Sequence, residues 1–446
     1  MARTSRLPGF YKVTVLERRA LVSEATGADG AEIEQALGGG GLDGETADKF
    51  VENVLGTYAL PYGVTLNVRV NDRDRVVPMV IEEPSVVAAA SNAAKLARAG
   101  GGFRAEADPP LMIAQVQLRE VKDAKAAVRR IAEHADEIVD RANRALGGLV
   151  SRGGGARSVE ARVLADDMVA AHVIIDCRDA MGANLVNAAA EAVGGRLAAI
   201  ADARLGLRIL SNLCDKRCVR VTCTVPADVL ATDDMSGDEV VDGIVNASRF
   251  AELDPYRAAT HNKGIMNGVD AVVIATGNDW RAVEAGAHAY AARTGQYRPL
   301  AVWRRDGNAI RGSLEMPLAL GTVGGTLRVH PAARLSLRML GISDAQELAA
   351  VAASVGLASN LAAVRALATD GIQRGHMGLH ARSVALAAGA TGSLVEKVAA
   401  LIVEARDITL EGARKALAVL RRAEKSGDST GNDAADDAGD ETLSAD

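Results

Sequence analysis

The sequence has few aromatic residues, no long uninterrupted hydrophobic run and little proline. Only 3% of the 446 residues are aromatic, so small and aliphatic side chains must fill the core, and abundant Ala and Gly favour closely packed helices. No segment approaches the ~20 uninterrupted apolar residues that cross a bilayer. The segment after Met1 also lacks the apolar run of a signal peptide. We therefore expect a cytoplasmic, helix-rich protein with no membrane partner.

Cysteine and excess charge of one sign are also scarce. Cys214, Cys218 and Cys223 lack the paired CxxC spacing of a zinc site, no ligand histidines lie nearby, and Cys177 stands apart. We interpret all four as reduced, buried thiols and expect no metal. The net charge of −6, with basic residues scattered among acidic ones, gives no general attraction for nucleic acid.

The chain is long enough for two or three domains, because a single hydrophobic core stops growing well below 446 residues. Residues 1–60 read as helical with a Gly-rich break, and the alternation over residues 64–81 predicts a hairpin. Ser85 is expected to cap a helix over residues 86–99. Strands and helices alternate over residues 110–215, which predicts a separate small α/β sandwich.

The second half of the chain reads as a mixture of strands and helices. The terminal stretch from Ser426 contains Gly, Ser, Asp and Ala with almost no large apolar residue, so it is expected to be disordered. The predicted elements before it are a strand at 219–225, a helix at 237–251, a short strand at 271–275, a helix at 282–294, a strand pair over 299–316 and an Ala-rich helical pair over 344–369.

A formal GxGxxG occurs at Gly39, Gly41 and Gly44. The dinucleotide-binding interpretation is weak, because no strand precedes these glycines and no βαβ unit surrounds them. We interpret the segment as a loop between helices.

Two polar clusters follow predicted strands. Glu82 and Glu83 end the hairpin, where a carboxyl against apolar walls can act as an acid; alternatively, one is solvated and the other is a helix-terminal charge. Asp279, in Thr276-Gly277-Asn278-Asp279-Trp280, would keep a nearby lysine charged, or it is an ordinary helix N-cap.

Two further clusters carry cations and histidines. Arg257 offers a planar fork for a carboxylate and Lys263 a compact cation for an oxyanion, with glycines that let backbone approach a ligand. The alternative is a surface loop with helix caps. His376 and His380 follow the predicted helical pair; no acidic partner or third ligand accompanies them, so a general acid is favoured over a metal site.

Taken together and in this order, these clusters resemble the class II 3-hydroxy-3-methylglutaryl-CoA (HMG-CoA) reductases of bacteria. The resemblance runs from Leu7-Pro8 to about residue 420, and several motifs are too long and unusual for chance agreement. The motifs are Glu52-Asn53-Val54-Leu55-Gly56, Glu82-Glu83-Pro84-Ser85, Asp179-Ala180-Met181-Gly182-Ala183-Asn184, His261 to Gly268, Gly277-Asn278-Asp279-Trp280 and Gly375-His376-Met377.

The resemblance implies two NAD(P)H-dependent hydride transfers that interconvert HMG-CoA with mevalonate and CoA, through a hemithioacetal and mevaldehyde. Lys263 would stabilise the oxyanion and Asp279 would hold Lys263 charged. His376 would protonate the departing CoA thiolate, and Glu83 would be the protonated carboxyl at the substrate oxygen. By the same match, Ser85, Arg257 and Asn267 hold the hydroxymethylglutaryl end, and the cofactor loop is represented by Asp179, Met181, Gly182 and Asn184.

The resemblance also implies an α+β fold: a large, mostly helical substrate domain with an inserted small, ferredoxin-like, non-Rossmann cofactor domain and a C-terminal helical flap. The family is dimeric at minimum, often hexameric, with sites shared between subunits near Glu52 to Gly56. The expected segments are the large domain at 1–109 and 216–372, the inserted domain at 110–215, the flap at 373–425 and an acidic tail at 426–446.

The choice of nicotinamide is left open by one departure from the family pattern. NADH-preferring relatives can place an Asp after the segment that reads Ala142-Asn143-Arg144 here, but this chain continues to Leu146 without one. We therefore expect NADPH to be accepted, with Arg144, Arg152 or Arg157 as partners for its 2′-phosphate. Two other functions stay open: a CoA-thioester hydrolase, although no GxSxG elbow is present, and a non-catalytic CoA-thioester-binding protein.

Overall fold

The computed structural model describes residues 4–369 and 372–428, with the side chains of residues 326, 372–379 and 423–428 left out. The chain divides into two compact units, Met1–Thr369 and Asp370–Asp446. The first unit contains two separate hydrophobic cores, one built around a six-stranded sheet and the other around a four-stranded sheet. Helices and mixed sheets in this arrangement confirm the predicted α+β class.

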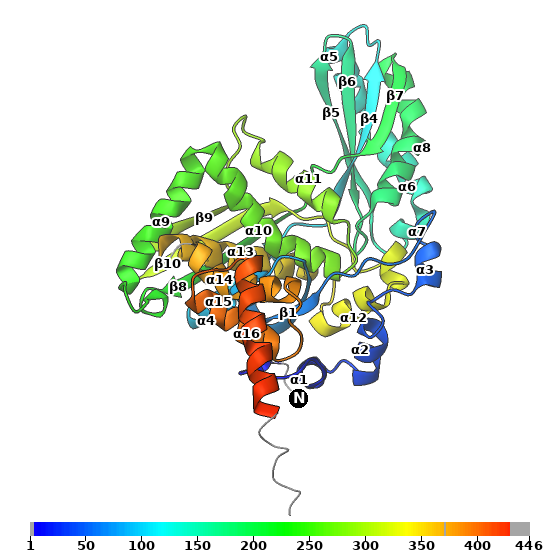
Figure 1. Ribbon diagram of the computed structural model, residues 1–446. Helices are drawn as coiled ribbons and strands as arrows, with labels where there is room; N and C mark the ends of the chain where they lie inside the picture. Colours follow the sequence, from blue (N-terminus) through cyan, green and yellow to red (C-terminus); the bar gives the residue numbers. More distant parts are fainter. Residues whose placement is uncertain (1–3, 370–371, 429–446) are drawn as a thin grey trace, which may run out of the picture. The chain divides into compact units, whose positions relative to one another are not determined.

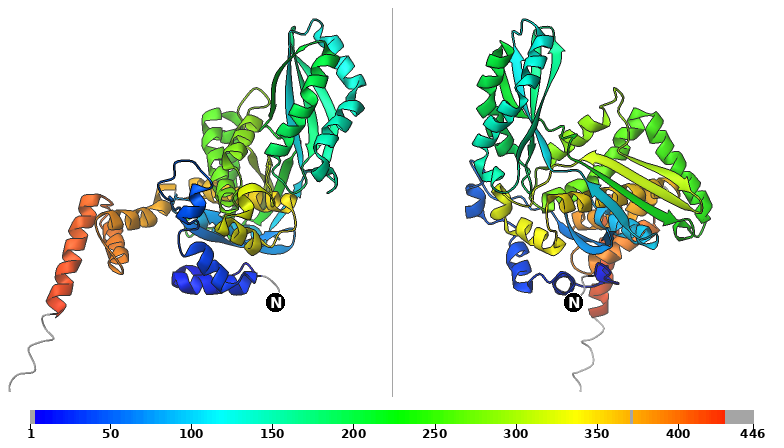
Figure 2. Two further views of the ribbon diagram at one scale, coloured as in Figure 1. Left: turned by 90° about the vertical axis from the view of Figure 1, so that its right-hand side faces the viewer. Right: turned by 180° about the vertical axis from the view of Figure 1, so that it is seen from behind.

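The six-stranded sheet forms the framework of the large domain (Figures 1 and 2). Its strands, in spatial order, are β2 (Arg73–Val80), β1 (Tyr62–Val70), β3 (Phe103–Ala107), β8 (Cys218–Pro226), β10 (Ala309–Pro317) and β9 (Ala301–Asp306). Its first two strands in spatial order are the predicted hairpin. Its last three are paired antiparallel, with β10 between β8 and β9.

The central helix of the large domain is α13 (Ala345–Ala368). The sequence predicted a helical pair here, but the structure has one continuous helix, because Gly356 fits against Ile265 and Val269 and no turn is required. The helix is long and apolar enough to cross a membrane, yet 83% of its most apolar window is buried inside the protein. It is therefore a core helix of the large domain.

Helix α10 (Pro255–Ala275) packs along α13 and carries most of the second sequence cluster. The predicted loop and the predicted strand at 271–275 are both wrong, because this whole stretch is helical. Asp254 caps it by accepting a hydrogen bond from Arg257 N at 3.0 Å, and Pro255 occupies its first turn. The neighbouring helices are α9 (Gly237–Leu253), α11 (Trp280–Ala291) and α12 (Pro331–Leu340).

The four-stranded sheet belongs to the inserted small domain, at the top of Figure 1. Its connectivity is βαββαβ with spatial order β5-β6-β4-β7 and antiparallel pairing throughout, which is the ferredoxin-like arrangement. Its elements are β4 (Leu111–Arg119), α5 (Ala124–Glu133), α6 (Ala135–Ala145), α7 (Gly147–Val150), β5 (Gly155–Ala165), β6 (Met168–Asp176), α8 (Ala183–Ala201) and β7 (Arg204–Leu210).

The N-terminal segment forms three short helices: α1 (Val15–Thr26), α2 (Gly30–Leu37) and α3 (Gly44–Asp48). Gly39 and Gly41 fall between α2 and α3, and Gly44 is the first residue of α3, so the interpretation of the segment as a loop between helices is confirmed. The predicted helix does not continue to residue 60; the stretch after residue 53 is extended and places Leu55 and Tyr58 in solvent.

Short single-turn 3₁₀ helices complete the first unit. They are Phe10–Lys12, Asp228–Leu230 and Gly325–Arg328.

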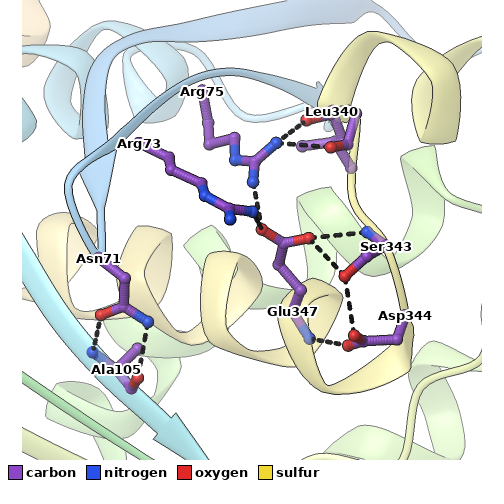
Figure 3. Close-up of polar contacts among 9 residues, drawn as sticks. Asn71, Arg73, Arg75, Ala105, Leu340, Ser343, Asp344 and Glu347 are labelled. Carbon is purple, nitrogen blue, oxygen red and sulfur yellow. Dashed lines mark hydrogen bonds and ion pairs between the residues drawn. The ribbon is translucent and has the colours of Figure 1, made fainter.

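Figure 3 shows how the hairpin is fastened to the start of α13. The guanidinium of Arg75, on β2, is only 5% exposed and donates to the carbonyls of Leu340 and Gly341, each at 2.7 Å. It also pairs with Glu347, and Arg73 lies 3.3 Å from the same carboxylate. These bonds fix the strand that leads to Glu83 against the central helix.

The second unit is a small helical bundle with its own apolar core, which includes Ala381, Val398 and Leu417. Its helices are α14 (Ile372–Ala387), α15 (Leu394–Glu404) and α16 (Leu410–Asp428). This unit corresponds to the predicted flap; the predicted acidic tail lies almost entirely outside the described residues.

Candidate functional site

The link between β2 and helix α4 (Val86–Ala99) meets α10 at a cluster of polar side chains. Lys263 Nζ lies 2.6 Å from Glu83 Oε2, and Asn267 Nδ2 donates to the same oxygen at 3.3 Å. Lys263 and Asn267 are i and i+4 on α10, so both point from one helix face. The structure thus joins one residue of the first sequence cluster to two residues of the second.

Ser85 begins α4 in a strained conformation with an unused hydroxyl. Its φ is +75°, in the left-handed region that a non-glycine residue rarely adopts, and its side chain makes no capping bond. The expected N-cap hydrogen bond is therefore absent. Its Oγ is buried without a hydrogen-bond partner among the described residues, so this donor is left available beside Glu83.

Arg257 lies two turns before Lys263 on α10 and provides a second cation. Its guanidinium is half-buried, and partial burial lowers its pKa from the ordinary value. No hydrogen bond or ion pair engages this guanidinium within the described part of the chain. An arginine held in this state can bind a carboxylate with two parallel hydrogen bonds.

His261 and Asn262, from the same motif, have structural roles. His261 Nε2 lies 3.0 Å from the carbonyl of Ala301, and burial lowers the pKa of His261 to about 4, so its ring is neutral. Asn262 accepts from Leu300 N at 2.9 Å and donates to the Arg298 carbonyl at 2.9 Å. Both residues hold α10 against β9 and the residues just before it.

The glycines of this motif pack helices together. A Cβ on Gly268 would lie 2.6 Å from the carbonyl oxygen of Val355, so only glycine lets α10 approach α13 this closely. A Cβ on Gly264 would meet only Ala363, at 3.9 Å. The predicted role of these glycines in admitting a ligand is not what the structure shows for Gly268.

A cavity of about 490 Å³ among α1, α2 and the start of the hairpin is mostly apolar; Tyr62 and His330 line it, and Glu83, Lys263 and Asn267 do not. A second cavity, of about 790 Å³, lies at the start of α8. It is lined by Met181, Gly182 and Asn184 from the predicted cofactor loop, by Gly277 to Arg281, by residues 323–325, and by Arg152 and Arg328.

The start of α8 has a glycine turn and no acidic side chain in its first helical turn. Gly182 has φ +105°, and a Cβ there would lie 2.5 Å from Cys177 Sγ, so the turn requires glycine. The first turn of this 19-residue helix contains no acidic side chain, and Gly182 offers no side-chain cap, so backbone N–H groups face the cavity wall.

Asp179 has a different position from its neighbours in the loop. Its carboxylate accepts from Ala345 N, at the start of α13, at 3.1 Å, and its carbonyl accepts from Thr322 N at 2.8 Å. The side chain therefore fastens the loop to the large domain, whereas Met181, Gly182 and Asn184 line the cavity.

Two further side chains bond the backbone in and beside this loop: Arg217, which the sequence analysis did not select, and Asn278, from the Gly277-Asn278-Asp279-Trp280 motif. Arg217 is only 5% exposed, and its guanidinium donates to the carbonyls of Ala180 and Met181 at 3.3 Å each. The amide of Asn278 bonds Gly321 in both directions, at 2.8 and 3.1 Å. Arg217 belongs to no recognisable pattern of spacing, because it acts through backbone atoms of distant segments.

Asp279 lies at the cavity and not beside Lys263. It caps α11 by accepting from Ala282 N at 3.1 Å, and Arg281 lies 3.8 Å from its carboxylate. Among the described residues no hydrogen bond or ion pair joins it to Lys263. The stretch of α10 from Lys263 to Ala275 spans about 18 Å, and Asp279 lies beyond its far end.

The arginines near the cavity differ in their availability. Arg157 donates to the Gly153 carbonyl at 2.6 Å and to Asp176 at 2.9 Å, so it is occupied. Arg152 lines the cavity, and none of the described residues forms a hydrogen bond or ion pair with its guanidinium. Leu146 is only 3% exposed and belongs to the small-domain core.

The remaining groups considered from the sequence are His376, the four cysteines and the residue types that bind metals. The side chain of His376 lies outside the described residues, although α14 includes its position. All four cysteines are buried and free, as predicted, and burial raises the pKa of each thiol. In the described ranges, no group of three or more His, Cys, Asp or Glu side chains is arranged to hold a metal ion.

Comparison with known proteins gives consistent matches along the chain. The family model for hydroxymethylglutaryl-coenzyme A reductase matches residues 14–381. The chain is 48% identical over 425 residues to the 3-hydroxy-3-methylglutaryl-coenzyme A reductase of Archaeoglobus fulgidus, covering 94% of this chain and 96% of that protein. It is 33% identical to a probable reductase of the same name from Borreliella burgdorferi, covering 75% of this chain and 77% of that protein.

Solved structures agree with these matches. The reductase of Streptococcus pneumoniae superposes with a TM-score of 0.79 at 40% identity, covering 93% of this chain and 99% of that chain. A structure described as the class II enzyme of that organism bound to NADPH in open conformations gives a TM-score of 0.78 at 40% identity, covering 81% of this chain and 99% of that chain.

Proposed function

This chain belongs to the hydroxymethylglutaryl-coenzyme A reductase family, as a class II member that interconverts HMG-CoA and mevalonate, and we propose which of its residues perform the reaction. The observation that carries the proposal is the cluster of Glu83, Lys263 and Asn267, with the unpartnered Ser85 hydroxyl in the same link as Glu83 and the free guanidinium of Arg257 on the same helix as Lys263.

Lys263 and Glu83 act at the carbonyl that is reduced. Negative charge develops on the carbonyl oxygen of the thioester, and later of the aldehyde, as hydride arrives at carbon. The Lys263 ammonium stabilises that oxygen, and the Glu83 carboxyl, whose Oε2 lies 2.6 Å from Lys263 Nζ, supplies a proton to it. Asn267 orients Glu83 through its 3.3 Å hydrogen bond, which adds an orienting role to the substrate contact expected from the sequence.

Arg257 and Ser85 bind the other end of the substrate. The Arg257 guanidinium holds the free carboxylate of the hydroxymethylglutaryl group, and the Ser85 hydroxyl satisfies its hydrogen bonding with the same group. Binding at these fixed points places the thioester carbon next to Lys263.

The cavity at the start of α8 fits a nicotinamide dinucleotide, which supplies the hydride when bound. Met181, Gly182 and Asn184 would form the wall along which the dinucleotide lies, and Asp179 would keep this loop in place through α13. The free guanidinium of Arg152 would accommodate a 2′-phosphate, while Leu146 is buried and offers no carboxylate against one. We therefore propose that NADPH is accepted.

The complete site is formed by two copies of the chain. The substrate end at Lys263 and the cofactor cavity at Asp279 lie at opposite ends of the 263–275 stretch of α10, so the Asp279 of one copy would meet the Lys263 of another. Val51, Leu55 and Tyr58 are 60%, 105% and 91% exposed, an apolar surface suited to a second copy. A dimer is the minimum assembly that this arrangement requires, and a hexamer would contain three such pairs.

The remaining roles are proposed from the family alone. His376, on the C-terminal unit, would protonate the departing CoA thiolate, and the unit at 373–425 would open between the two hydride transfers. Replacing His376 by Gln should impair HMG-CoA reduction more than reduction of free mevaldehyde. We also propose that the enzyme works in the cytoplasm and in either direction, as metabolite levels dictate.

The proposed chemistry is tested by nicotinamide absorbance with purified protein. HMG-CoA is offered with NADPH or NADH separately, and mevalonate, CoA and each oxidised cofactor are offered for the reverse reaction. We expect two equivalents of NADPH oxidised for each HMG-CoA consumed. Thioester cleavage without nicotinamide oxidation would instead indicate a hydrolase, and binding of HMG-CoA with no turnover would indicate a non-catalytic protein.

A further inference from the structure

A chain of titratable side chains joins α10 to α11 away from the residues that contact Lys263. Asp270, on α10, lies one turn beyond Asn267 and faces Glu284 on α11, within hydrogen-bonding reach of its carboxyl. Glu284 lies 2.5 Å from His288 Nε2, and His288 Nδ1 lies 2.6 Å from the hydroxyl of Tyr297. The sequence alone gave no reason to connect these residues.

The contact between Asp270 and Glu284 requires a proton. Asp270 Oδ1 is buried and has no hydrogen-bond partner among the described residues if both carboxyls are ionised. Two carboxylates this close repel each other strongly, whereas one shared proton turns the contact into a hydrogen bond.

The surroundings decide which carboxyl holds the proton. The titratable group that faces Asp270 is Glu284, and those that face Glu284 are Asp270, His288 and Tyr297. Burial, and then the neighbouring Glu284, raises the pKa of Asp270 far above its ordinary value. The bond to His288 lowers the pKa of Glu284 and raises that of His288. At neutral pH Asp270 is therefore neutral and Glu284 ionised, and the bond to Glu284 favours the protonated form of His288.

The position of this chain gives it a consequence for the reaction. Helix α10 carries Lys263 and Asn267, and helix α11 starts at Asp279 in the cofactor cavity. The two helices are joined in sequence only by the short turn at residues 276–279. A displacement of about 1 Å at a catalytic group can cost about 100-fold in rate, so the angle between these helices matters.

We propose that Asp270, Glu284 and His288 form a proton-dependent clamp that fixes α11 against α10 and so positions Asp279 relative to the helix that carries Lys263. The three are positioning residues, because they touch neither substrate nor cofactor. The effect of the clamp on turnover rests on the proposed function. The shared proton between Asp270 and Glu284 does not depend on that function. When Asp270 loses that proton, the two carboxylates repel and the helices separate at this point.

The test compares Asp270→Asn, which keeps a donor toward Glu284 but cannot titrate, with Asp270→Leu, which has no donor. The exposed Asp228→Asn, on the 3₁₀ helix Asp228–Leu230, is the control. We expect Asp270→Leu to lose at least about tenfold in kcat with little change in KM for HMG-CoA, and Asp270→Asn to recover most of that loss. From about pH 7 to about pH 10, kcat of the wild type should fall more steeply than kcat of Asp270→Asn.

An infrared spectrum gives a readout that is independent of activity. Near neutral pH, the spectrum of the wild type minus that of Asp270→Asn should contain a protonated-carboxyl band, and Asp228→Asn minus Asp270→Asn should contain the same band. If this difference band is absent, the shared proton is wrongly assigned and the clamp is overturned. If the difference band is present but kcat of Asp270→Leu stays at the wild-type value, the positioning role is overturned. A wild type without reductase activity that still shows the band would contradict the proposed function and leave the proton assignment standing.

Discussion

Lys263 Nζ lies 2.6 Å from Glu83 Oε2, although 180 residues separate the two in the chain. Lys263 comes from the middle of α10, and Glu83 from the link that follows β2. The pair forms because Arg75 fastens β2 to the end of α12 and, through Glu347, to the start of α13, while Gly268 lets α10 lie closely against α13. The candidate site is thus assembled on the central helix α13.

Replacing Lys263 by Ala should lower kcat by about 10²- to 10³-fold, because a single oxyanion-stabilising group typically contributes that much. Steady-state kinetics with HMG-CoA and NADPH measure the change. Lys125→Ala, an exposed residue on α5, is the matched control and should retain full activity. Turnover within about threefold of wild type in Lys263→Ala would contradict the role assigned to Lys263.

A mixture of two inactive variants tests whether sites are shared between copies. Lys263→Ala and Asp279→Ala should each be nearly inactive alone. After dissociation and random reassociation, about half of the dimers are mixed, and each mixed dimer has one site with both residues intact, so about one quarter of wild-type activity should return. No recovery, with mixed dimers verified by differently tagged chains, would place both residues in a site within one chain.

Replacing Arg152 by Gln should raise KM for NADPH by about tenfold and change KM for NADH much less, because only NADPH carries the 2′-phosphate that this guanidinium would bind. The ratio of kcat/KM for the two cofactors is the quantity to compare. Arg144→Gln, on α6 and outside the cavity lining, serves as the control. An unchanged ratio in Arg152→Gln would move the phosphate site elsewhere.

Gly268→Ala should lower the free energy of unfolding by about 1–3 kcal/mol, because the added methyl collides with the Val355 carbonyl and forces α10 away from α13. Gly264→Ala, one turn earlier, has room for the methyl and should instead be neutral or stabilise the helix by up to about 1 kcal/mol. Urea denaturation followed by circular dichroism compares them. Equal free energies of unfolding for Gly268→Ala and Gly264→Ala would show that α10 and α13 can move apart without loss of stability.

The elements that the sequence predicted correctly are those with strong local signals. The helix that became α4 ends at a run of glycines, and the hairpin of β1 and β2 shows alternation around an Asn71-Asp72 turn. The family motifs likewise identified the residues at the strand-to-helix junction, Glu83 and Ser85.

Other elements were missed because their stability comes from distant partners. Strand β3 has only five residues and exists through its pairing with β8, and β5 is an exposed edge strand with weak alternation. The apolar run at 271–275 resembled a strand in isolation, but it is the end of α10 because the whole helix packs on α13.

The sequence by itself determined the family and the identities of the polar groups, because motifs are local properties of the chain, and the ferredoxin-like form of the insertion followed only from the family resemblance. Only the tertiary structure decided which of those groups meet. It joined Lys263 to Glu83, turned Asp179 toward α13, and placed Asp279 at the other end of α10. These outcomes depend on how closely the helices pack, and that distance is set by contacts between residues far apart in sequence.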